Sequence, residues 1–238
     1  MIRLGMILPS SNTVVEPVTI AIAAALPDVG LHFARFKLTQ VTVDDPAASY
    51  YRSGLLLQAA QLLADARCNV ITWNGSAGGV AGFDCDRTLC AEVERATGIP
   101  ATTSSLSLLE VFRATGVRRY GLVTLNPPAM NETIAANFRH EGYECVASTH
   151  RSDLEDNFEM AQVSPDEVRR LAEQCATARP DAIIVFGTNT RGAAIAHEVE
   201  ARLGIPVYDT VALGLWGALR RAGVDRSPLS GWGQLFTH

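Results

Sequence analysis

Three short stretches of this sequence are rich in small polar side chains, and two of them also contain glycine, which suits them to holding an anion. Residues 9–13 read Pro-Ser-Ser-Asn-Thr, residues 75–79 read Gly-Ser-Ala-Gly-Gly, and residues 187–192 read Gly-Thr-Asn-Thr-Arg-Gly. Each stretch leads into a predicted helix or turn, so its N–H groups and hydroxyls are placed to bind a carboxylate. Ordinary helix capping is the alternative. Residues 9–13 carry more polar groups than one cap needs, which favours binding.

Several other chemistries are not indicated. Residues 75–79 are not followed by the Gly-Lys-Ser/Thr of a Walker loop, and no Gly-x-Ser-x-Gly elbow or Gly-x-Gly-x-x-Gly dinucleotide loop occurs. The five cysteines form no Cys-x-x-Cys pair and no zinc-type spacing with histidine. We therefore expect free thiols and predict neither a metal nor a cofactor.

Acidic side chains near the predicted loops are candidates for a general base. Asp209 follows a predicted strand, where it either faces the site or caps the next helix. Asp84 and Asp86 lie in a loop predicted to be longer than its counterpart, where they act either as lid carboxylates or at a helix start. Arg191 either clamps a carboxylate or is solvated at a helix start.

Composition narrows the function classes. The chain has 238 residues, a net charge of −5 and only 7% aromatic residues, which argues against a nucleic-acid-binding surface. No apolar run approaches the roughly 18 residues of a membrane span. No signal peptide is evident at the start. We expect a soluble, cytoplasmic protein with a small anionic substrate and no nucleic-acid or membrane partner.

An internal repeat predicts the architecture that positions these loops. Ala-Glu-Val-Glu-Arg-Ala-Thr-Gly-Ile-Pro at 91–100 recurs as His-Glu-Val-Glu-Ala-Arg-Leu-Gly-Ile-Pro at 197–206. Upstream, the apolar run 69–75 matches 181–187. Such repetition indicates two copies of one structural unit.

Each copy alternates short apolar runs with helix-like segments. The first has predicted strands at 4–8, 30–37 and before 75, and the second has them at 121–125, 143–149 and before 187. A further strand follows Pro100 or Pro206, and a helix ends each copy. Strand–helix alternation predicts parallel sheets covered by helices.

The predicted fold is therefore α/β, with two pseudo-symmetric lobes that each hold a four-stranded parallel sheet. We expect an N-terminal lobe of residues 1–112, completed by 212–238, and a C-terminal lobe of residues 113–211. Ligands of such sheets bind beyond the carboxyl ends of the strands. The active site is therefore expected between the lobes, among the loops after Leu8, Gly75, Leu125 and Gly187.

The sequence resembles the aspartate/glutamate racemase superfamily, in the branch of maleate cis–trans isomerase and arylmalonate decarboxylase. The duplicated lobes, residues 9–12, the strand ends at 75 and 187, and the segments 155–157 and 231–236 carry this resemblance over nearly the whole chain. Members often form dimers or larger assemblies, so the resemblance implies a homo-oligomer.

The resemblance also implies a cysteine at the end of the third strand of each lobe, acting as acid, base or nucleophile. Here the first position falls on Gly75, and the second falls on Gly187 or, if the alignment shifts by one, on Thr188. Both thiols are missing. A serine or threonine hydroxyl cannot replace a thiolate at neutral pH without an adjacent base.

Unlike the two cysteine positions, the positions that bind carboxylates in this family carry matching residues here. By resemblance, Asn12 and Asn157 match asparagines that hold substrate carboxylates in maleate isomerase. In each lobe, residues directly after the third strand also match family positions that form carboxylate or oxyanion pockets. These residues are Ser76, Ala77, Thr188 and Asn189. Asn126 replaces a tyrosine that is common after the first strand of the second lobe.

Two functions follow as hypotheses. The first is an enzyme that stabilises an oxyanion formed from a small carboxylic acid, by decarboxylation, isomerisation or hydrolysis. Its catalytic candidates are Ser76, Thr188 and Asp209, with water or a lid carboxylate as other possible bases; Gly75 and Gly187 join the substrate-binding set. The second is a non-catalytic small-dicarboxylate-binding protein derived from such an enzyme.

Overall fold

The first half of the chain forms a four-stranded parallel sheet with strand order β2-β1-β3-β4. In this computed structural model, residues 1–38, 51, 54–154 and 156–238 are described. The strands of this sheet are β1 (Ile2–Pro9), β2 (Val29–Phe36), β3 (Val70–Trp73) and β4 (Ala101–Thr103). Its helices are α1 (Val15–Ala23), α3 (Leu55–Asp65), α4 (Ala77–Ala81), α5 (Phe83–Thr97) and α6 (Ser104–Thr115).

The second half repeats this topology in the strand order β6-β5-β7-β8. Its strands are β5 (Arg119–Thr124), β6 (Glu144–His150), β7 (Ala182–Phe186) and β8 (Val207–Asp209). Its helices are α7 (Pro128–His140), α8 (Asn157–Gln162), α9 (Pro165–Ala176), α10 (Ala193–Leu203) and α11 (Thr210–Arg221), followed by the 3₁₀ helices η1 (Ser227–Trp232) and η2 (Gln234–Thr237). The predicted α/β fold with two four-stranded parallel sheets is confirmed.

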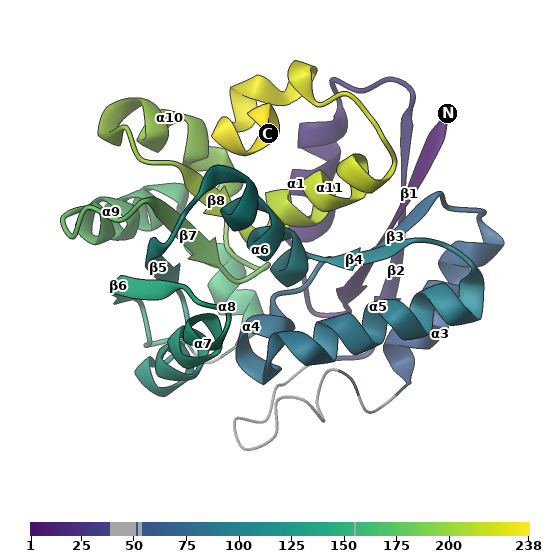
Figure 1. Cartoon of the computed structure of the whole chain (residues 1–238), viewed down its shortest axis with the longest axis horizontal. Coiled ribbons are helices and arrows are strands. Elements are labelled where there is room, and N and C mark those ends of the chain that lie inside the picture. Colours follow the sequence, from purple (N-terminus) through teal and green to yellow (C-terminus); the bar gives the residue numbers. More distant parts are fainter. Residues whose placement is uncertain (39–50, 52–53, 155) are drawn as a thin grey trace.

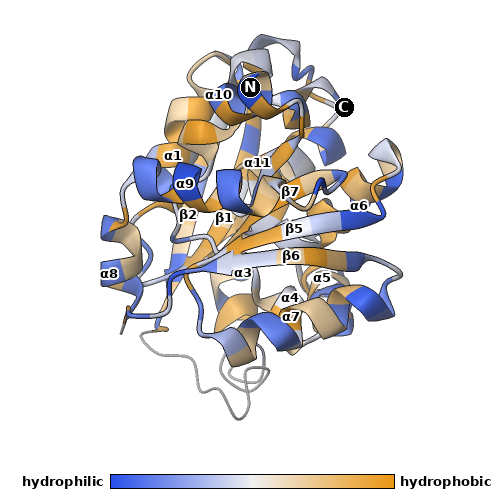
Figure 2. Ribbon diagram, turned by 90° about the vertical axis from the view of Figure 1, so that its left-hand side faces the viewer, coloured by the Kyte–Doolittle hydropathy of each residue, from blue (hydrophilic) through white to orange (hydrophobic). Residues whose placement is uncertain are grey.

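Local sequence explains why these segments adopt their structures. In α9, buried residues recur at Val168, Leu171, Ala172 and Cys175, the spacing of one helix face. The Ser164 side chain accepts a hydrogen bond from the Glu167 N–H, which caps the start of this helix. Figure 2 shows hydrophilic and hydrophobic residues alternating along α7 and α9, as expected of helices with one solvent-exposed face.

The two sheets share one apolar core. Figure 1 shows them side by side, with α6 and α11 packed between them. A single cluster of buried side chains includes Leu4 and Met6 of the first sheet and Leu122 and Ile184 of the second. Separate apolar clusters cover the far face of each sheet.

The last helix of the second half packs on the first sheet. Helix α11 contacts β3, β4 and α1 as well as α6. Phe112 of α6 packs against Tyr120 and Tyr208 of the second sheet, with ring centroids 5.9 and 6.2 Å apart. Each half therefore sends its final helix toward the other sheet, which holds the lobes together. Within the described residues, no helix has the length and apolar character needed to cross a bilayer.

Candidate functional site

A cavity of about 80 Å³ lies where the carboxyl ends of the central strands meet. Both glycines at the expected cysteine positions, Gly75 and Gly187, line it. The polar side chains that line it come from both lobes and include Asn12, Ser76, Asn126, Asn157, Thr188 and Asn189. The structure thus brings together nearly all of the predicted substrate-binding residues.

A tight turn follows β3 and another follows β7. The Gly79 N–H donates to the Ser76 carbonyl oxygen at 3.2 Å, and the Thr190 N–H donates to the Gly187 carbonyl oxygen at 3.1 Å. A turn closed in this way leaves the N–H groups of its two central residues free to bind an acceptor outside it. Thr188 and Asn189 are the central residues of the second turn, so their N–H groups are available as anion donors.

The backbone of Gly187 requires glycine. Its φ is +129°, a value that residues with a side chain rarely adopt. Its N–H donates to Thr210 Oγ1 at 3.1 Å, which ties the turn to α11. A cysteine at this position would therefore need a different local backbone.

Asn12 joins the two lobes across the cavity. Its Oδ1 accepts hydrogen bonds from the N–H groups of Val14 and Val15, both at 2.9 Å. Its Nδ2 donates to the Thr188 carbonyl oxygen at 2.9 Å. The Thr13 N–H donates to Asn189 Oδ1 at 3.1 Å beside it. Asn12 therefore holds the second turn in place as well as lining the cavity.

Asn157 makes a second link between the lobes. It is the first residue of α8, which the sequence did not predict and which Asp156 caps through the N–H groups of Phe158 and Glu159. The Nδ2 of Asn157 donates to Ser11 Oγ at 3.0 Å. Its carbonyl oxygen accepts a hydrogen bond from Asn189 Nδ2.

Ala77 is placed differently from the other predicted binding residues. Its side chain packs in the apolar core of the first lobe and does not line the cavity. Only its N–H, in the first turn of α4, faces the same end of the sheet. A contribution of Ala77 to binding is thus limited to its backbone.

Asp209 does not face the cavity and instead caps α11. Its Oδ1 accepts hydrogen bonds from the N–H groups of Val211 and Ala212 at 2.9 and 3.0 Å. Desolvation by burial raises the pKa of this carboxyl to about 7, although backbone hydrogen bonds from the same residues lower it. Of the two positions expected for Asp209, the structure shows the cap, because a carboxylate directly before a helix satisfies its first N–H groups.

Of the two roles expected for Asp84 and Asp86, the structure shows the helix start, because both lie in the first turn of α5. Asp86 is buried and accepts hydrogen bonds from Tyr51 at 2.5 Å and Thr103 at 2.6 Å. Desolvation raises the pKa of Asp86 to about 6. Asp84 is exposed and pairs with Arg87 at 2.7 Å. Neither carboxylate lines the cavity, so neither acts as a lid here.

All five cysteines lie away from the cavity. Burial raises the pKa of Cys90 and that of Cys175 to about 12, and it also raises the pKa values of Cys68 and Cys145. A raised pKa keeps these four thiols protonated and unreactive. Among the described residues, no cluster of three or more histidine, cysteine or acidic side chains could hold a metal ion.

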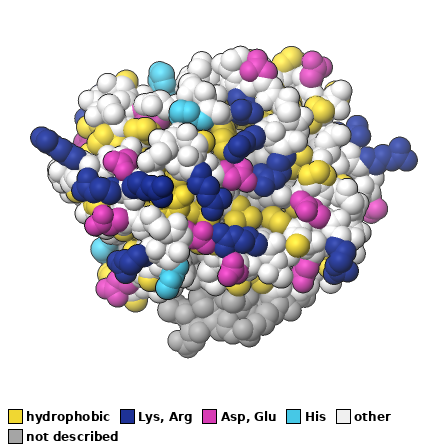
Figure 3. Space-filling model, in the orientation of Figure 1, with side chains coloured by type: hydrophobic (Ala, Val, Ile, Leu, Met, Phe, Trp, Pro, Cys, Tyr) yellow, Lys and Arg dark blue, Asp and Glu magenta, His cyan; other side chains and the backbone are white. Residues whose placement is uncertain are grey.

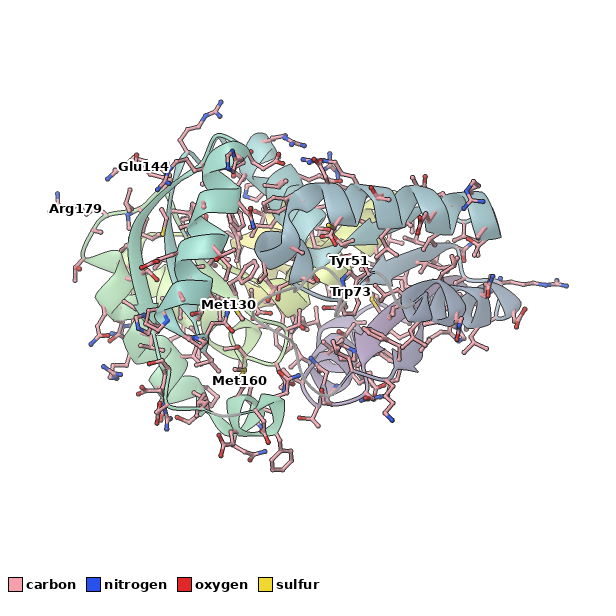
Figure 4. All side chains as sticks on the ribbon, turned by 90° about the horizontal axis from the view of Figure 1, so that it is seen from below. Tyr51, Trp73, Met130, Glu144, Met160 and Arg179 are labelled. Carbon is pink, nitrogen blue, oxygen red and sulfur yellow. The ribbon has the colours of Figure 1, made fainter. Side chains whose placement is uncertain are left out.

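The cavity lining also has an apolar part that the sequence did not reveal. Its side chains are those of Pro9, Leu38, Trp73, Val80, Leu125, Met130, Met160 and Phe186. Figure 4 shows Trp73, Met130 and Met160 near the junction of the lobes, with Tyr51 beside Trp73. The only earlier signal was the position of Trp73 and Phe186 at strand ends, which an ordinary core residue shares.

The lining is electrically neutral where the structure describes it. It combines amides, hydroxyls and apolar groups, and in the described residues it contains no acidic, basic, histidine or cysteine side chain. Arg191 is exposed and lies outside the lining, so of its two expected roles the structure shows the solvated one. An anion in this cavity would be held by dipolar donors rather than by a counter-charge.

The known proteins to which this chain is similar include enzymes. The profile of the arylmalonate decarboxylase family matches residues 4–236. Arylmalonate decarboxylase of Bordetella bronchiseptica is 34% identical over 158 residues, which span 65% of this chain and 65% of that enzyme, a little under two thirds of its length. Maleate isomerase of Nocardia farcinica is 25% identical over 228 residues, covering 92% of this chain and 89% of that enzyme.

Solved structures of proteins with the same names have a similar fold. A double mutant of arylmalonate decarboxylase in a liganded form has a TM-score of 0.86 at 27% identity, covering 99% of both chains. A variant of maleate isomerase Iso from Pseudomonas putida S16, solved with maleate, has a TM-score of 0.87 at 24% identity, covering 99% of this chain and 97% of that one. The second likeness concerns the fold alone.

Proposed function

Because this chain belongs to the arylmalonate decarboxylase family, as the match over residues 4–236 shows, we propose that it is an enzyme that decarboxylates a small malonate-type acid in the cavity between its lobes. Its relatives include enzymes that act on small carboxylic acids. The observation that carries the choice of reaction is the neutral cavity, with anion donors on the turns and an apolar wall.

Decarboxylation requires fewer catalytic groups than the other reactions considered. The bond between the central carbon and one carboxylate breaks, CO₂ leaves, and the electron pair becomes part of an enediolate on the remaining carboxylate. Water then protonates the carbon and is left as hydroxide. The first step needs donors for the enediolate and an apolar place for the departing carboxylate, but no base or nucleophile.

The N–H groups of Thr188 and Asn189 and the hydroxyls of Ser76 and Thr188 supply the donors. One well-placed donor to a developing oxyanion lowers a barrier by roughly 3–4 kcal/mol. Leu38, Val80 and Phe186 supply an apolar surface that keeps water away from the departing carboxylate. Asn12 and Asn157 contribute by fixing the turn that carries the donors, Asn12 through the Thr188 carbonyl oxygen and Asn157 through the Asn189 side chain.

The other reactions need groups that the described lining does not offer. Rotation about a carbon–carbon double bond requires a nucleophile that adds to it and then leaves. Racemisation requires a base that removes a proton from carbon. Cysteine-independent decarboxylation is therefore the reaction that best matches the cavity.

A non-catalytic small-dicarboxylate-binding protein is the second candidate. The neutral lining favours it too, because donors that hold an anion need not transform it. The two candidates differ only in whether a bound acid is consumed.

Proton NMR in D₂O separates them. The purified protein is incubated with methylmalonate, ethylmalonate, maleate and aspartate, beside samples without protein. We expect methylmalonate to become propionate that carries deuterium at the carbon next to the carboxylate. Binding without consumption would establish the second candidate, and conversion of maleate to fumarate or racemisation of aspartate would contradict both.

A further inference from the structure

The indole of Trp73 fills the space beside Gly75. A Cβ built on Gly75 would lie 2.2, 2.3 and 2.7 Å from Cζ2, Cε2 and Cη2 of Trp73, all atoms of the six-membered ring. No real Cβ approaches so closely, so this ring takes the place of any side chain at position 75. Trp73 is 2% exposed and packs edge-on against Phe36, with ring centroids 5.3 Å apart, which fixes the ring there.

A second aromatic ring limits the cavity from the other lobe. A Cβ on Gly79 would lie 2.3 Å from Cζ of Phe186, so this ring packs directly on the turn after β3. Phe186 in turn packs against Phe138, with centroids 6.1 Å apart. Trp73 and Phe186 both line the cavity, and both rings are buried.

The cavity has a smaller volume than a protein cavity that is known to hold an aromatic molecule. A cavity of about 150 Å³ is the size that accepts a benzene molecule in a protein interior. The cavity here is about 80 Å³, and it must also hold at least one carboxylate. A short alkyl group and a carboxylate suit this volume.

We propose that Trp73 is the specificity-determining residue of this cavity, restricting its ligands to acids with a short alkyl substituent and excluding aryl-substituted ones. This inference rests on the proposed function in that it takes the cavity as the carboxylate site. It sets this chain apart from a relative whose name specifies an arylmalonate substrate.

Binding of unreactive monocarboxylates tests the inference without requiring turnover. Affinities for propionate and phenylacetate are measured by isothermal titration calorimetry on wild type, Trp73→Phe and Trp216→Phe. Trp73→Phe removes part of the indole while keeping an aromatic core residue. Trp216→Phe is the matched control, because Trp216 is equally buried and does not line the cavity.

We expect wild type and Trp216→Phe to bind propionate at least about tenfold more tightly than phenylacetate, and Trp73→Phe to reduce that preference by about tenfold. Val80→Ala, which enlarges the cavity from α4, provides a second variant if Trp73→Phe does not fold. It is expected to reduce the preference in the same direction.

Equal binding of the two acids by wild type would overturn the inference, as would a preference unchanged in both cavity variants. If methylmalonate is nevertheless decarboxylated, the proposed function stands and only the size limit fails. If the predicted preference is found without any turnover, the size limit stands and the reaction fails. If wild type binds neither propionate nor phenylacetate, the inference is overturned, and the methylmalonate assay decides the proposed function separately.

Discussion

Ser76 brings a hydroxyl to the cavity without capping a helix. It lines the cavity and makes no side-chain capping bond to α4. We predict that Ser76→Ala weakens propionate binding about tenfold or more, because a hydrogen bond to a charged group is worth about 1.5–3 kcal/mol. The free energy of unfolding should change by less than about 0.5 kcal/mol.

Ser107→Ala is the matched control for this prediction. The Ser107 hydroxyl is buried in α6, where it donates to the Thr103 carbonyl oxygen at 2.8 Å. Its removal should leave propionate affinity unchanged. Calorimetry and urea unfolding of both variants measure the two effects, and an unchanged affinity in Ser76→Ala would remove this hydroxyl from the site.

Asp209 makes stability depend on pH. Its pKa is about 7 in the folded protein and about 3.9 in an unfolded chain. Between about pH 4 and 7 the folded state therefore binds the extra proton, and stability falls as pH rises, by at most roughly 1.4 kcal/mol per pH unit. Asp86, with a pKa of about 6, acts in the same direction over the lower part of this range.

Asp209→Asn should retain an oxygen that caps α11 but lose this titration. We predict that the unfolding free energy of wild type falls relative to that of Asp209→Asn as pH rises from 5 to about 7, in urea titrations at each pH. Parallel pH profiles would contradict the burial of this carboxyl. If Asp209 were instead the catalytic base, the variant would lose activity with no such difference in stability.

For individual residues, the sequence predicted the polar side chains that line the cavity and missed the apolar ones. Asn12, Ser76 and Thr188 stand out because they are polar residues directly after predicted strands. Trp73 and Met160 do not, because nothing in their local sequence separates a cavity wall from a core. Asp209 was left between two roles, and only its three-dimensional position shows that it is a cap.

Among the elements, the crossing of α6 and α11 depends on small residues. A Cβ on Gly217 would lie 2.0 Å from Ser107 Oγ, and one on Gly214 would lie 2.9 Å from Ser104 Oγ, both atoms of α6. The two helices can therefore approach closely only because α11 has glycine at these positions. This contact sits directly behind the strand end that carries Gly75.

We predict that Gly217→Ala destabilises the protein by about 1–3 kcal/mol through overpacking. The loss should be smaller in a Ser107→Ala background, which removes the clashing oxygen. A double-mutant cycle by urea unfolding measures the coupling, expected to exceed about 0.5 kcal/mol. Strictly additive effects would show that the helices do not meet at these two residues.

The internal repeat made the elements predictable. Both copies gave the strands in the right order, and the helix starting at Ser164 was marked by a serine followed by proline and glutamate. Helix α8 was missed because its six residues are too few for a periodic apolar pattern. Asp84 and Asp86 were left between a lid and a helix start, and both lie in the first turn of α5.

In the whole molecule, the lobes share their core and should unfold together. We propose a first lobe of residues 1–112 with 212–238 and a second of 113–211, since α11 packs on β3 and β4. We predict coincident urea transitions by tryptophan fluorescence and far-ultraviolet circular dichroism. Deletion of residues 212–238 should abolish the cooperative transition, whereas two separate transitions in the intact chain would contradict the shared core.

The surface in view carries no large patch of only positive or only negative side chains. Arginine and lysine side chains are interspersed with acidic ones on the face in Figure 3. Assembly into a homo-oligomer stays a proposal drawn from the resemblance, and light scattering after size-exclusion chromatography measures it.

A crystal structure with isobutyrate bound would test most directly whether neutral donors between the lobes hold a carboxylate. Isobutyrate resembles the product of decarboxylation and cannot lose CO₂ by the same route. We predict its carboxylate in the cavity, with an oxygen about 2.7–3.1 Å from the N–H nitrogen atoms of Thr188 and Asn189. A carboxylate bound instead at the exposed side chains of Arg113 in α6 and Arg220 and Arg221 in α11, with the cavity holding only water, would contradict the account.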